Sequence, residues 1–545
     1  MDVRKHVPPQ STNSTEIEEQ QLLGLTIPPR PAIDRRANYQ LSMKRTIHSI
    51  AMALRHLSFP VVTGATAALS LCVPTDAARG QSHPPTGFQE VANARWQKLT
   101  NQPSFNTDTA LLLTDGTVMV HQYSSQNWWR LTPDINGSYL NGTWSQIASM
   151  ASNYGPLYFA SAVLSDGRVL VEGGEYNFGS PVETNLGAIY NPTTNSWTTV
   201  SPPAGWSTIG DSPCVVLNDG TFMMGRNASK QQVLFNAATL TWTAVGTGKA
   251  DNYSEEGFSL TPGGSVLLVD TASGTNSELY NPATGQWATA GSTIVKLADA
   301  GSLEIGPKIQ RPDGTIVAFG GTVHNAIYNP TTGTWATGPD FPGGNDMADA
   351  PASLLPSGNV LVFVSPGVFQ TPAMFYVFDG STFTQAPSTQ SAGQLTSYEG
   401  RTLLLPSGQV LWLVADGSTI DVEIYTSNGK PNAAWAPTIT SVPRTLTRGN
   451  SYQISGTQFN GLSCGSDYGD DVTMASNYPL VRITNTATGH VFYARTHDHS
   501  TMGIATGSTI VSTTIDVPAT AEAGSSTIAV VANGISSKAR RVTIQ

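Results

Sequence analysis

The stretch Tyr158–Gly174, YFASAVLSDGRVLVEGG, decides the fold. An apolar run at 160–164 precedes Asp166-Gly167, and a second apolar run follows at 169–171. Two short apolar runs joined by Asp-Gly are typical of a β-hairpin, in which we expect both turn residues to adopt positive φ. A second hairpin with its own turn follows at 189–197, IYNPTTNSW, so the whole stretch predicts a four-stranded unit.

This unit recurs through residues 105–430, at the spacing of about fifty residues that kelch repeats show. The matching turn pairs are Asp115-Gly116, Asp166-Gly167, Asp219-Gly220, Gly263-Gly264, Asp313-Gly314, Ser357-Gly358 and Ser407-Gly408. Most copies also end in a tryptophan, which we expect to fill the space between neighbouring blades; these are Trp144, Trp197, Trp242, Trp287 and Trp335, with Phe383 as a replacement. Seven copies whose edges are hidden by closure into a ring predict a seven-bladed kelch-type β-propeller over 105–435.

The repeat stops after Trp435, and a second domain begins. Residues 436–545 contain short alternating runs such as 452–456, YQISG, and 542–544, VTI. This pattern is typical of an immunoglobulin-like early-set β-sandwich. The predicted fold class is therefore all-β, a seven-bladed kelch-type β-propeller followed by an immunoglobulin-like β-sandwich.

The N-terminal part has a different character. Residues 1–42 are polar and aperiodic, which indicates either disorder or a start codon assigned too far upstream. Residues 43–78 place basic residues before a mostly apolar run at 59–73 and small residues after it, as in a secretory signal peptide. The alternative is a short membrane anchor, but the run is too short to span a bilayer comfortably. We therefore expect a secreted protein (extracellular, periplasmic or at the cell surface), in which 79–104 closes onto the propeller.

Charge and cysteine content exclude several classes of partner and site. The chain carries a formal charge of −10, and without residues 1–78 it has 20 Lys/Arg against 32 Asp/Glu, or −12. So acidic a protein is a poor partner for nucleic acid or anionic membranes. Cys72, Cys214 and Cys464 lack any zinc-site spacing, and we expect the last two to be free and buried. We also expect a monomer without nucleotide or flavin.

The residue eight positions before each turn aspartate, or before its replacement, marks a candidate site. Equal offsets in equal repeats give equivalent places, here the entrance of each innermost strand around one mouth of the central channel. The seven residues are Thr107, Tyr158, Asp211, Glu255, Ile305, Asp349 and Glu399. Crowded carboxylates are costly unless a cation, a proton or hydrogen-bond donors offset them. Two interpretations stay open: solvated strand ends rich in acids, or a mouth that binds a metal or a polyhydroxylated or cationic ligand.

Over residues 90–545, the domain order and these residues resemble the galactose oxidase and glyoxal oxidase family of copper-radical oxidases. That family binds copper through two tyrosines, two histidines and solvent, with one tyrosine cross-linked to a cysteine. The resemblance implies that Tyr158 is the cross-linked tyrosine and Tyr398 the axial one. It implies that His497, in RTHDH, is the histidine which the C-terminal domain sends into the mouth. Tyr176 stands where some members place a tryptophan over the cross-link.

Two departures bear on the chemistry that the resemblance implies. Glu399 replaces the second histidine, and 106–108 holds no cysteine for the cross-link. The implied ligand set for copper or another divalent metal is thus Tyr158, Tyr398, Glu399 and His497, with the two tyrosines catalytic. Without the thioether a tyrosyl radical is hard to maintain, and a carboxylate ligand suits Cu(I) less well than imidazole does.

Three functions follow as hypotheses. The first is a metal-dependent oxidoreductase acting on extracellular alcohols, aldehydes or carbohydrates. The second is a non-catalytic propeller that binds a carbohydrate or a protein at its acidic mouth, with Tyr176, Asp211, Glu255 and Asp349 as ligand-binding residues. The third is a hydrolase or lyase that uses Asp211 and Glu255 as paired acids.

Overall fold

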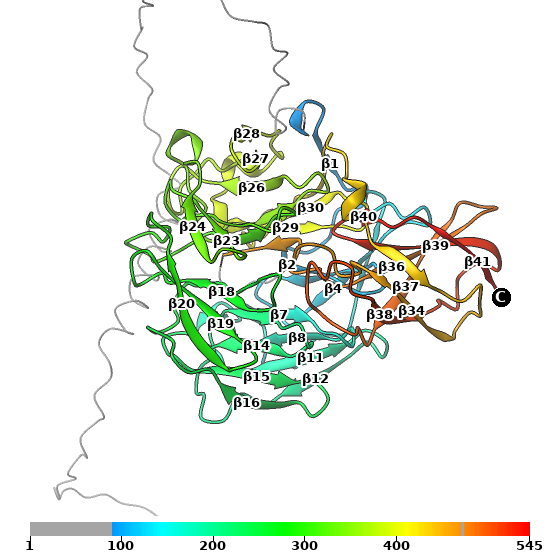
Figure 1. Ribbon diagram of the computed structural model, residues 1–545, viewed down its shortest axis with the longest axis horizontal. Coiled ribbons are helices and arrows are strands. Elements are labelled where there is room, and N and C mark those ends of the chain that lie inside the picture. The colour runs from blue at the N-terminus through cyan, green and yellow to red at the C-terminus, as the bar shows by residue number, and fades with distance from the viewer. Residues whose placement is uncertain (1–89, 470–473) are drawn as a thin grey trace, which may run out of the picture. The chain divides into compact units, whose positions relative to one another are not determined.

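The computed structural model describes residues 90–469 and 474–545, and these residues are almost entirely β-structure (Figure 1). The expectations for 1–42, 43–78 and Cys72 lie outside the described residues. The all-β fold class is confirmed, because the strands of the described residues form a series of small antiparallel sheets and one larger sheet system. In the described part of the chain, no helix has the length and apolar character needed to cross a bilayer.

Within residues 95–426, seven antiparallel sheets each contain four strands of this region. The first four are β2 (Thr107–Leu112), β3 (Val118–Gln122), β4 (Trp128–Thr132) and β5 (Thr143–Gln146); β7 (Ala160–Val163), β8 (Val169–Glu172), β11 (Gly187–Asn191) and β12 (Ser196–Val200); β13 (Cys214–Val216), β14 (Phe222–Gly225), β15 (Gln232–Asn236) and β16 (Thr241–Val245); and β17 (Ser259–Leu260), β18 (Val266–Val269), β19 (Asn276–Asn281) and β20 (Gln286–Ser292). The others are β21 (Lys308–Gln310), β22 (Ile316–Ala318), β23 (Ala326–Asn329) and β24 (Thr334–Thr337); β25 (Ala352–Leu354), β26 (Val360–Val364), β27 (Met374–Phe378) and β28 (Phe383–Gln385); and β29 (Gly400–Leu404), β30 (Val410–Val414) and β31 (Val422–Thr426) with β1 (Arg95–Lys98).

The first strands of these sheets form the inner surface of a propeller-type arrangement. Strand β2 contacts both β7 and β29, and further contacts join β7 to β13, β13 to β17, β21 to β25 and β25 to β29. Strand β1 comes from before the repeats and pairs with β31 from their end, Arg95 opposite Thr426. This pairing ties the two chain ends of the domain together, as radial closure requires. The number of blades stays a prediction.

The turn of the inner hairpins differs from the expected type. The seven turn glycines have φ between 67 and 88 degrees at most, and those of the inner hairpins are Gly116 (76°), Gly167 (80°), Gly220 (86°), Gly264 (81°), Gly314 (87°), Gly358 (88°) and Gly408 (78°). In β7–β8 the Gly167 N–H donates to Leu164 O at 2.9 Å, and Asp166 is not among the residues with positive φ. The expectation that both residues adopt positive φ is therefore wrong. Only glycine takes the left-handed conformation, as in a three-residue hairpin loop, while Asp166 Oδ1 accepts the Arg168 N–H at 2.9 Å.

The repeated tryptophans bridge neighbouring sheets, as the sequence predicts. Their indole N–H groups donate to the preceding repeat: Trp197 to Ala148 O at 2.8 Å, Trp242 to Ser201 O at 2.9 Å, Trp287 to Gln232 Oε1 at 2.8 Å and Trp335 to Ser277 Oγ at 2.9 Å. Phe383 packs instead against Phe341 and Phe378, with ring centroids 4.9 Å away in both cases. Each bridge buries an aromatic ring between two sheets and so stabilises their contact.

The C-terminal domain, orange to red in Figure 1, is a β-sandwich. Its strands are β32 (Thr438–Ser441), β33 (Thr445–Leu446), β34 (Ser451–Thr457), β36 (Leu480–Asn485), β37 (Val491–His497), β38 (Val511–Asp516), β39 (Gly524–Ala532), β40 (Ile535–Ser536) and β41 (Arg540–Ile544). Alternate side chains of these strands, among them Ile454, Ile483, Ile515 and Ile528, form one buried cluster. The period of two in burial matches the alternation seen in the sequence.

One segment of the C-terminal domain enters the propeller. Strand β35 (Ser466–Asp467) pairs antiparallel with β25, so that Ser353 lies opposite Ser466 and Ala352 opposite Asp467. Before it, Gly465 O accepts the Leu354 N–H at 2.7 Å. Because β25 runs from the mouth toward its turn, β35 carries the chain from the turn end of the channel to the mouth.

Short elements complete the mouth. A small sheet joins β6 (Pro156–Leu157), β9 (Tyr176–Asn177) and β10 (Ser180–Pro181) beside Tyr158. The described 3₁₀-helices are η2 (Pro342–Gly344), η3 (Ala392–Gln394), η4 (Ser397–Glu399) and η5 (Ala433–Trp435). Of these, η4 directly precedes β29 and carries Tyr398 at the entrance of the innermost strand.

Candidate functional site

The equivalent positions lie where the repeat pattern places them, at the start of the innermost strands. Tyr158 stands two residues before β7, Glu399 one residue before β29 and Asp349 three residues before β25. Neighbouring repeats meet here directly, since the Asp349 N–H donates to Ile305 O at 3.2 Å. Tyr158 and Asp349 both have left-handed backbones, with φ of 52° and 48°. Such strained conformations in non-glycine residues concentrate at functional sites.

Tyr158 is the centre of an aromatic group at this mouth. Its ring meets that of Tyr176 edge to face, with centroids 6.1 Å apart. Burial raises the pKa of the Tyr158 phenol well above its usual range, and the nearby Tyr123 and Tyr398 phenols raise it further. The Tyr158 phenol is therefore neutral at physiological pH and close to the Tyr398 phenol, as the equivalence of their positions implied.

Tyr398 presents a half-buried ring beside this group. The ring packs edge to face on Phe369, with centroids 5.2 Å apart. Its backbone carbonyl accepts the Tyr468 hydroxyl and Arg401 Nη1, each at 2.8 Å. Tyr468 follows β35 directly, so the side chain that the C-terminal domain delivers to the mouth is this tyrosine.

A buried charge network lies beneath the tyrosines. The fully buried Arg401 stacks on the Tyr468 ring, with its guanidinium carbon 4.2 Å from the centroid, and Arg401 Nη2 contacts Asp108 Oδ1 at 3.3 Å. Asp108 Oδ2 lies 3.1 Å from His121 Nδ1, and His121 Nε2 lies 2.7 Å from Ser125 O. Burial raises the pKa of Asp108, but the hydrogen bond from His121 and the charge of Arg401 outweigh it and hold that pKa below its usual range. Asp108 is thus an ionised acceptor, and both nitrogens of His121 face acceptors.

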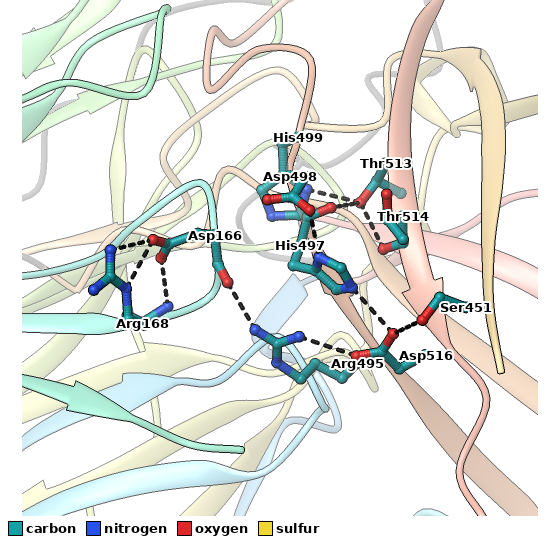
Figure 2. Close-up of polar contacts among 10 residues, drawn as sticks. All are labelled: Asp166, Arg168, Ser451, Arg495, His497, Asp498, His499, Thr513, Thr514 and Asp516. Carbon is teal, nitrogen blue, oxygen red and sulfur yellow. Dashed lines mark hydrogen bonds and ion pairs between the residues drawn. The ribbon is translucent and has the colours of Figure 1, made fainter. Parts of the chain in front are cut away.

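His497 does not reach this mouth, which corrects the expectation that it enters with Tyr158 and Tyr398. Figure 2 shows its ring between two aspartates of its own domain: Nδ1 lies 2.8 Å from Asp498 Oδ2 and Nε2 lies 3.1 Å from Asp516 Oδ1. Beside it, Arg495 Nη2 donates to Asp166 O at 2.7 Å. Asp166 belongs to the turn at the far end of β7, so an innermost strand separates His497 from Tyr158.

His499, two residues further on, is also held at the turn end. Its backbone N–H donates to Ser165 O at 3.2 Å, and its Nδ1 lies 2.9 Å from Thr513 Oγ1. Burial, together with the charges of His497 and Arg495, lowers the pKa of His499 to about 3. The ring is therefore neutral and structural.

Glu399 serves the backbone of η4. Its Oε2 accepts the Thr396 N–H at 2.9 Å in a capping box, in which the Thr396 side chain accepts from the Glu399 backbone. This arrangement satisfies two donors that a helix start otherwise leaves without partners. A structural role for the carboxylate follows directly from this geometry.

The remaining predicted residues are buried or half-buried at the mouth. Asp211 is buried and accepts the amide of Asn227, while Glu255 is buried on the next repeat. Cys214 and Cys464 are both free, the first buried and the second half-buried. The expectation of free cysteines is confirmed, with the difference that Cys464 is only partly covered.

A second acidic group lies to one side, where Asp251, Glu256 and Asp270 bring carboxylate oxygens within 4.8 Å of one another. The ammonium of Lys249 already lies among them, 2.6 Å from Asp251, 3.1 Å from Asp270 and 2.6 Å from Glu278. Burial raises the pKa of Glu256 to about 8, although the charge of Lys249 counteracts the rise. A side-chain cation therefore compensates these acids, as a metal ion would.

The sequence reasoning missed Arg401, Asp108, Tyr468 and Phe369. Two of them left a signal, because Asp108 and Arg401 are charged residues at the start of otherwise apolar inner strands, TDTALL and GRTLL. A charge in such a strand needs a partner from a neighbouring strand. Ring closure makes β2 and β29 neighbours, which pairs residues 293 positions apart.

Comparisons with known proteins leave the family open. No protein-family model matches the sequence, and no curated protein matches it. Among solved structures, a fungal alcohol oxidase of the AA5 family in complex with copper is 14% identical with a TM-score of 0.47, over 83% of this chain and 98% of that one. A streptogramin B lyase is 10% identical with a TM-score of 0.44, over 62% and 99%. A catalytically inactive virginiamycin B lyase from Staphylococcus aureus with quinupristin is 10% identical with a TM-score of 0.43, over 61% and 99%. These likenesses carry no argument about function.

The donors at the mouth do not fit the copper ion that the family resemblance implied. Of the four expected ligands, His497 lies at the other end of the channel and the Glu399 carboxylate caps η4. The Arg401 guanidinium lies against Tyr468, and its positive charge acts on Tyr158, where it disfavours a second cation. The described residues therefore supply phenols but no imidazole to this place.

Proposed function

We propose that the protein is a carbohydrate-binding propeller, with the mouth around Tyr158, Tyr176 and Tyr398 as its binding site. The observation that carries the proposal is the edge-to-face contact of Tyr158 with the half-buried Tyr176, in the same mouth as the Tyr398–Phe369 pair. Aromatic rings with a polar edge suit sugars, because the ring covers C–H groups while the phenol hydroxyl bonds with sugar hydroxyls. Ligand sites of this kind combine apolar walls with a few fixed polar groups.

The acids of the mouth support the same ligand class. Asp211, Glu255 and Asp349 stand at the equivalent positions of three repeats and offer oxygen acceptors. Beneath them, the ion pair of Arg401 with Asp108 fixes the backbone of Tyr398 through two carbonyl contacts at 2.8 Å. A ring held in place before binding loses little conformational entropy on binding.

Titration calorimetry with a panel of uncharged oligosaccharides tests the proposal. For a sugar that binds, Tyr176→Ala should weaken the Kd about tenfold, the effect of one lost aromatic contact. Tyr176→Phe keeps the ring and should lose less. Tyr452→Ala, in the C-terminal domain, is the distant control and should leave the Kd unchanged. Binding that ignores Tyr176→Ala, or a panel without any binder, contradicts the proposal.

A metal-dependent oxidoreductase is the second candidate, favoured by the closeness of the Tyr158 and Tyr398 phenols. The missing imidazole counts against it. Metal analysis of the purified protein, with hydrogen peroxide release from alcohols and aldehydes, distinguishes the two. Stoichiometric copper that is lost in Tyr398→Phe would favour the oxidoreductase, whereas a metal-free protein that binds sugars favours the binding module.

A further inference from the structure

A groove with a basic lining runs between the last repeat of the propeller and the C-terminal domain. Its volume is about 720 Å³, within the range of ligand sites. One wall contains Ser407 from the turn after β29 and Pro437 from the linker, and the other contains Arg482, Lys538 and Arg540. No aspartate or glutamate contributes to the lining, so the groove is cationic.

The three cationic side chains are not neutralised by neighbours. None of them forms an ion pair within residues 90–469 and 474–545. Arg540 Nη2 donates to Ile439 O at 2.8 Å and Arg482 Nη2 to Ser536 Oγ at 3.3 Å, contacts that orient each guanidinium through neutral acceptors. Oriented guanidinium groups bind carboxylate or sulfate through two parallel hydrogen bonds.

The position of this groove is unusual in so acidic a protein. Residues 105–435 hold 10 Lys/Arg against 25 Asp/Glu, whereas residues 436–545 hold 7 against 6. An anionic polymer is therefore repelled by the propeller and attracted to the groove, which directs it to one surface. The lining contains no aromatic ring on which nucleic-acid bases could stack, which favours a sugar polymer over a single-stranded nucleic acid.

We infer that the groove formed by Arg482, Lys538 and Arg540 binds an acidic polysaccharide, through carboxylate or sulfate groups on its sugars. The site is separate from the tyrosine mouth and does not depend on the function proposed for it. Carboxylate and sulfate share the chemistry that guanidinium recognises, so polymers of both kinds enter the test.

The experiment measures binding of the full chain to polygalacturonate, to dextran sulfate and to uncharged dextran, at low and at physiological salt. We expect one or both charged polymers to bind and dextran not to bind. The triple variant Arg482→Gln, Lys538→Gln and Arg540→Gln should weaken binding at least tenfold and reduce its salt dependence. Thermal unfolding checks that this variant remains folded.

A matched control carries the same change of charge elsewhere. Lys230, Lys296 and Arg448 are exposed cations outside the groove, and their triple change to Gln should leave the Kd within about twofold. Equal losses in the two triple variants would show non-specific attraction and overturn the inference. Binding of dextran with equal affinity would also overturn it, as would single-stranded DNA that binds as tightly and loses as much. Tyr176→Ala leaves this binding intact, which separates the groove from the mouth.

Discussion

The two ends of the propeller channel differ in what the C-terminal domain contributes to them. At the mouth end, Tyr468 stacks on the buried Arg401 and bonds to Tyr398, next to the Tyr158 phenol. At the turn end, Arg495 and His499 contact the backbone of one hairpin turn, at Asp166 and Ser165 (Figure 2). The same domain thus supplies an aromatic side chain to a pocket and a set of polar contacts to a docking surface. The comparison teaches that a histidine-rich motif marked the docking surface, whereas the pocket is marked by an inserted strand.

Removal of Arg401 should give the largest effect and would break the mouth end alone. Arg401→Met leaves the Asp108 carboxylate buried without its guanidinium and removes two contacts to backbone carbonyls. Loss of one partner of a buried ion pair costs about 3–5 kcal/mol of unfolding free energy. Denaturant unfolding measures it. Arg311→Met removes a half-exposed pair with Asp313 and, as the control, should cost at most about 1 kcal/mol. Equal costs in both variants would contradict a network at the mouth.

The dependence of stability on pH should distinguish the two ends by its sign. Glu256, on the mouth side, has a pKa raised by burial to about 8, so the folded state binds more protons than the unfolded state above about pH 5. Its contribution to stability is present at low pH and is lost as the pH rises toward 8. Glu256→Gln should therefore flatten the fall in unfolding free energy between pH 5 and 8.

His499, at the turn end, should act in the opposite sense. Burial lowers its pKa to about 3, so the unfolded state binds more protons below the ordinary histidine pKa of about 6.5. Its contribution is present above pH 6.5 and is lost as the pH falls toward 3. In His499→Gln the acid side of the stability profile should become shallower. A profile that responds only on the alkaline side, or not at all, would contradict this assignment.

Tyr468→Phe should give a smaller and more local effect. It removes the hydroxyl that donates to Tyr398 O at 2.8 Å but keeps the ring over Arg401. We expect a loss of about 1 kcal/mol in unfolding free energy and a weaker Kd for a sugar bound at the mouth, because Tyr398 is less firmly positioned. Calorimetry and chemical unfolding on the same sample report both values. Unchanged sugar affinity would separate Tyr468 from the site.

His497→Gln should have the smallest effect. Its two aspartate contacts are partly exposed, and pairs of this kind contribute at most about 1 kcal/mol. Sugar affinity and metal content should be unchanged, because an innermost strand separates His497 from the tyrosines. Should this variant abolish binding at the mouth or remove a bound metal, the distinction between the two ends would be wrong.

The sequence by itself determined the elements that repeat. Left-handed glycines close each inner hairpin, tryptophans bridge neighbouring sheets, and an equal offset placed Tyr158 and Tyr398 at the same end, because these features depend on residues within one or two adjacent repeats. Only the tertiary structure decided what lies between distant segments. The Arg401–Asp108 pair exists because the ring closes, and Tyr468 rather than His497 reaches the mouth because β35 pairs with β25. A local pattern fixes strands and turns, whereas the depth to which one domain enters another depends on non-local pairing that no single stretch of sequence encodes.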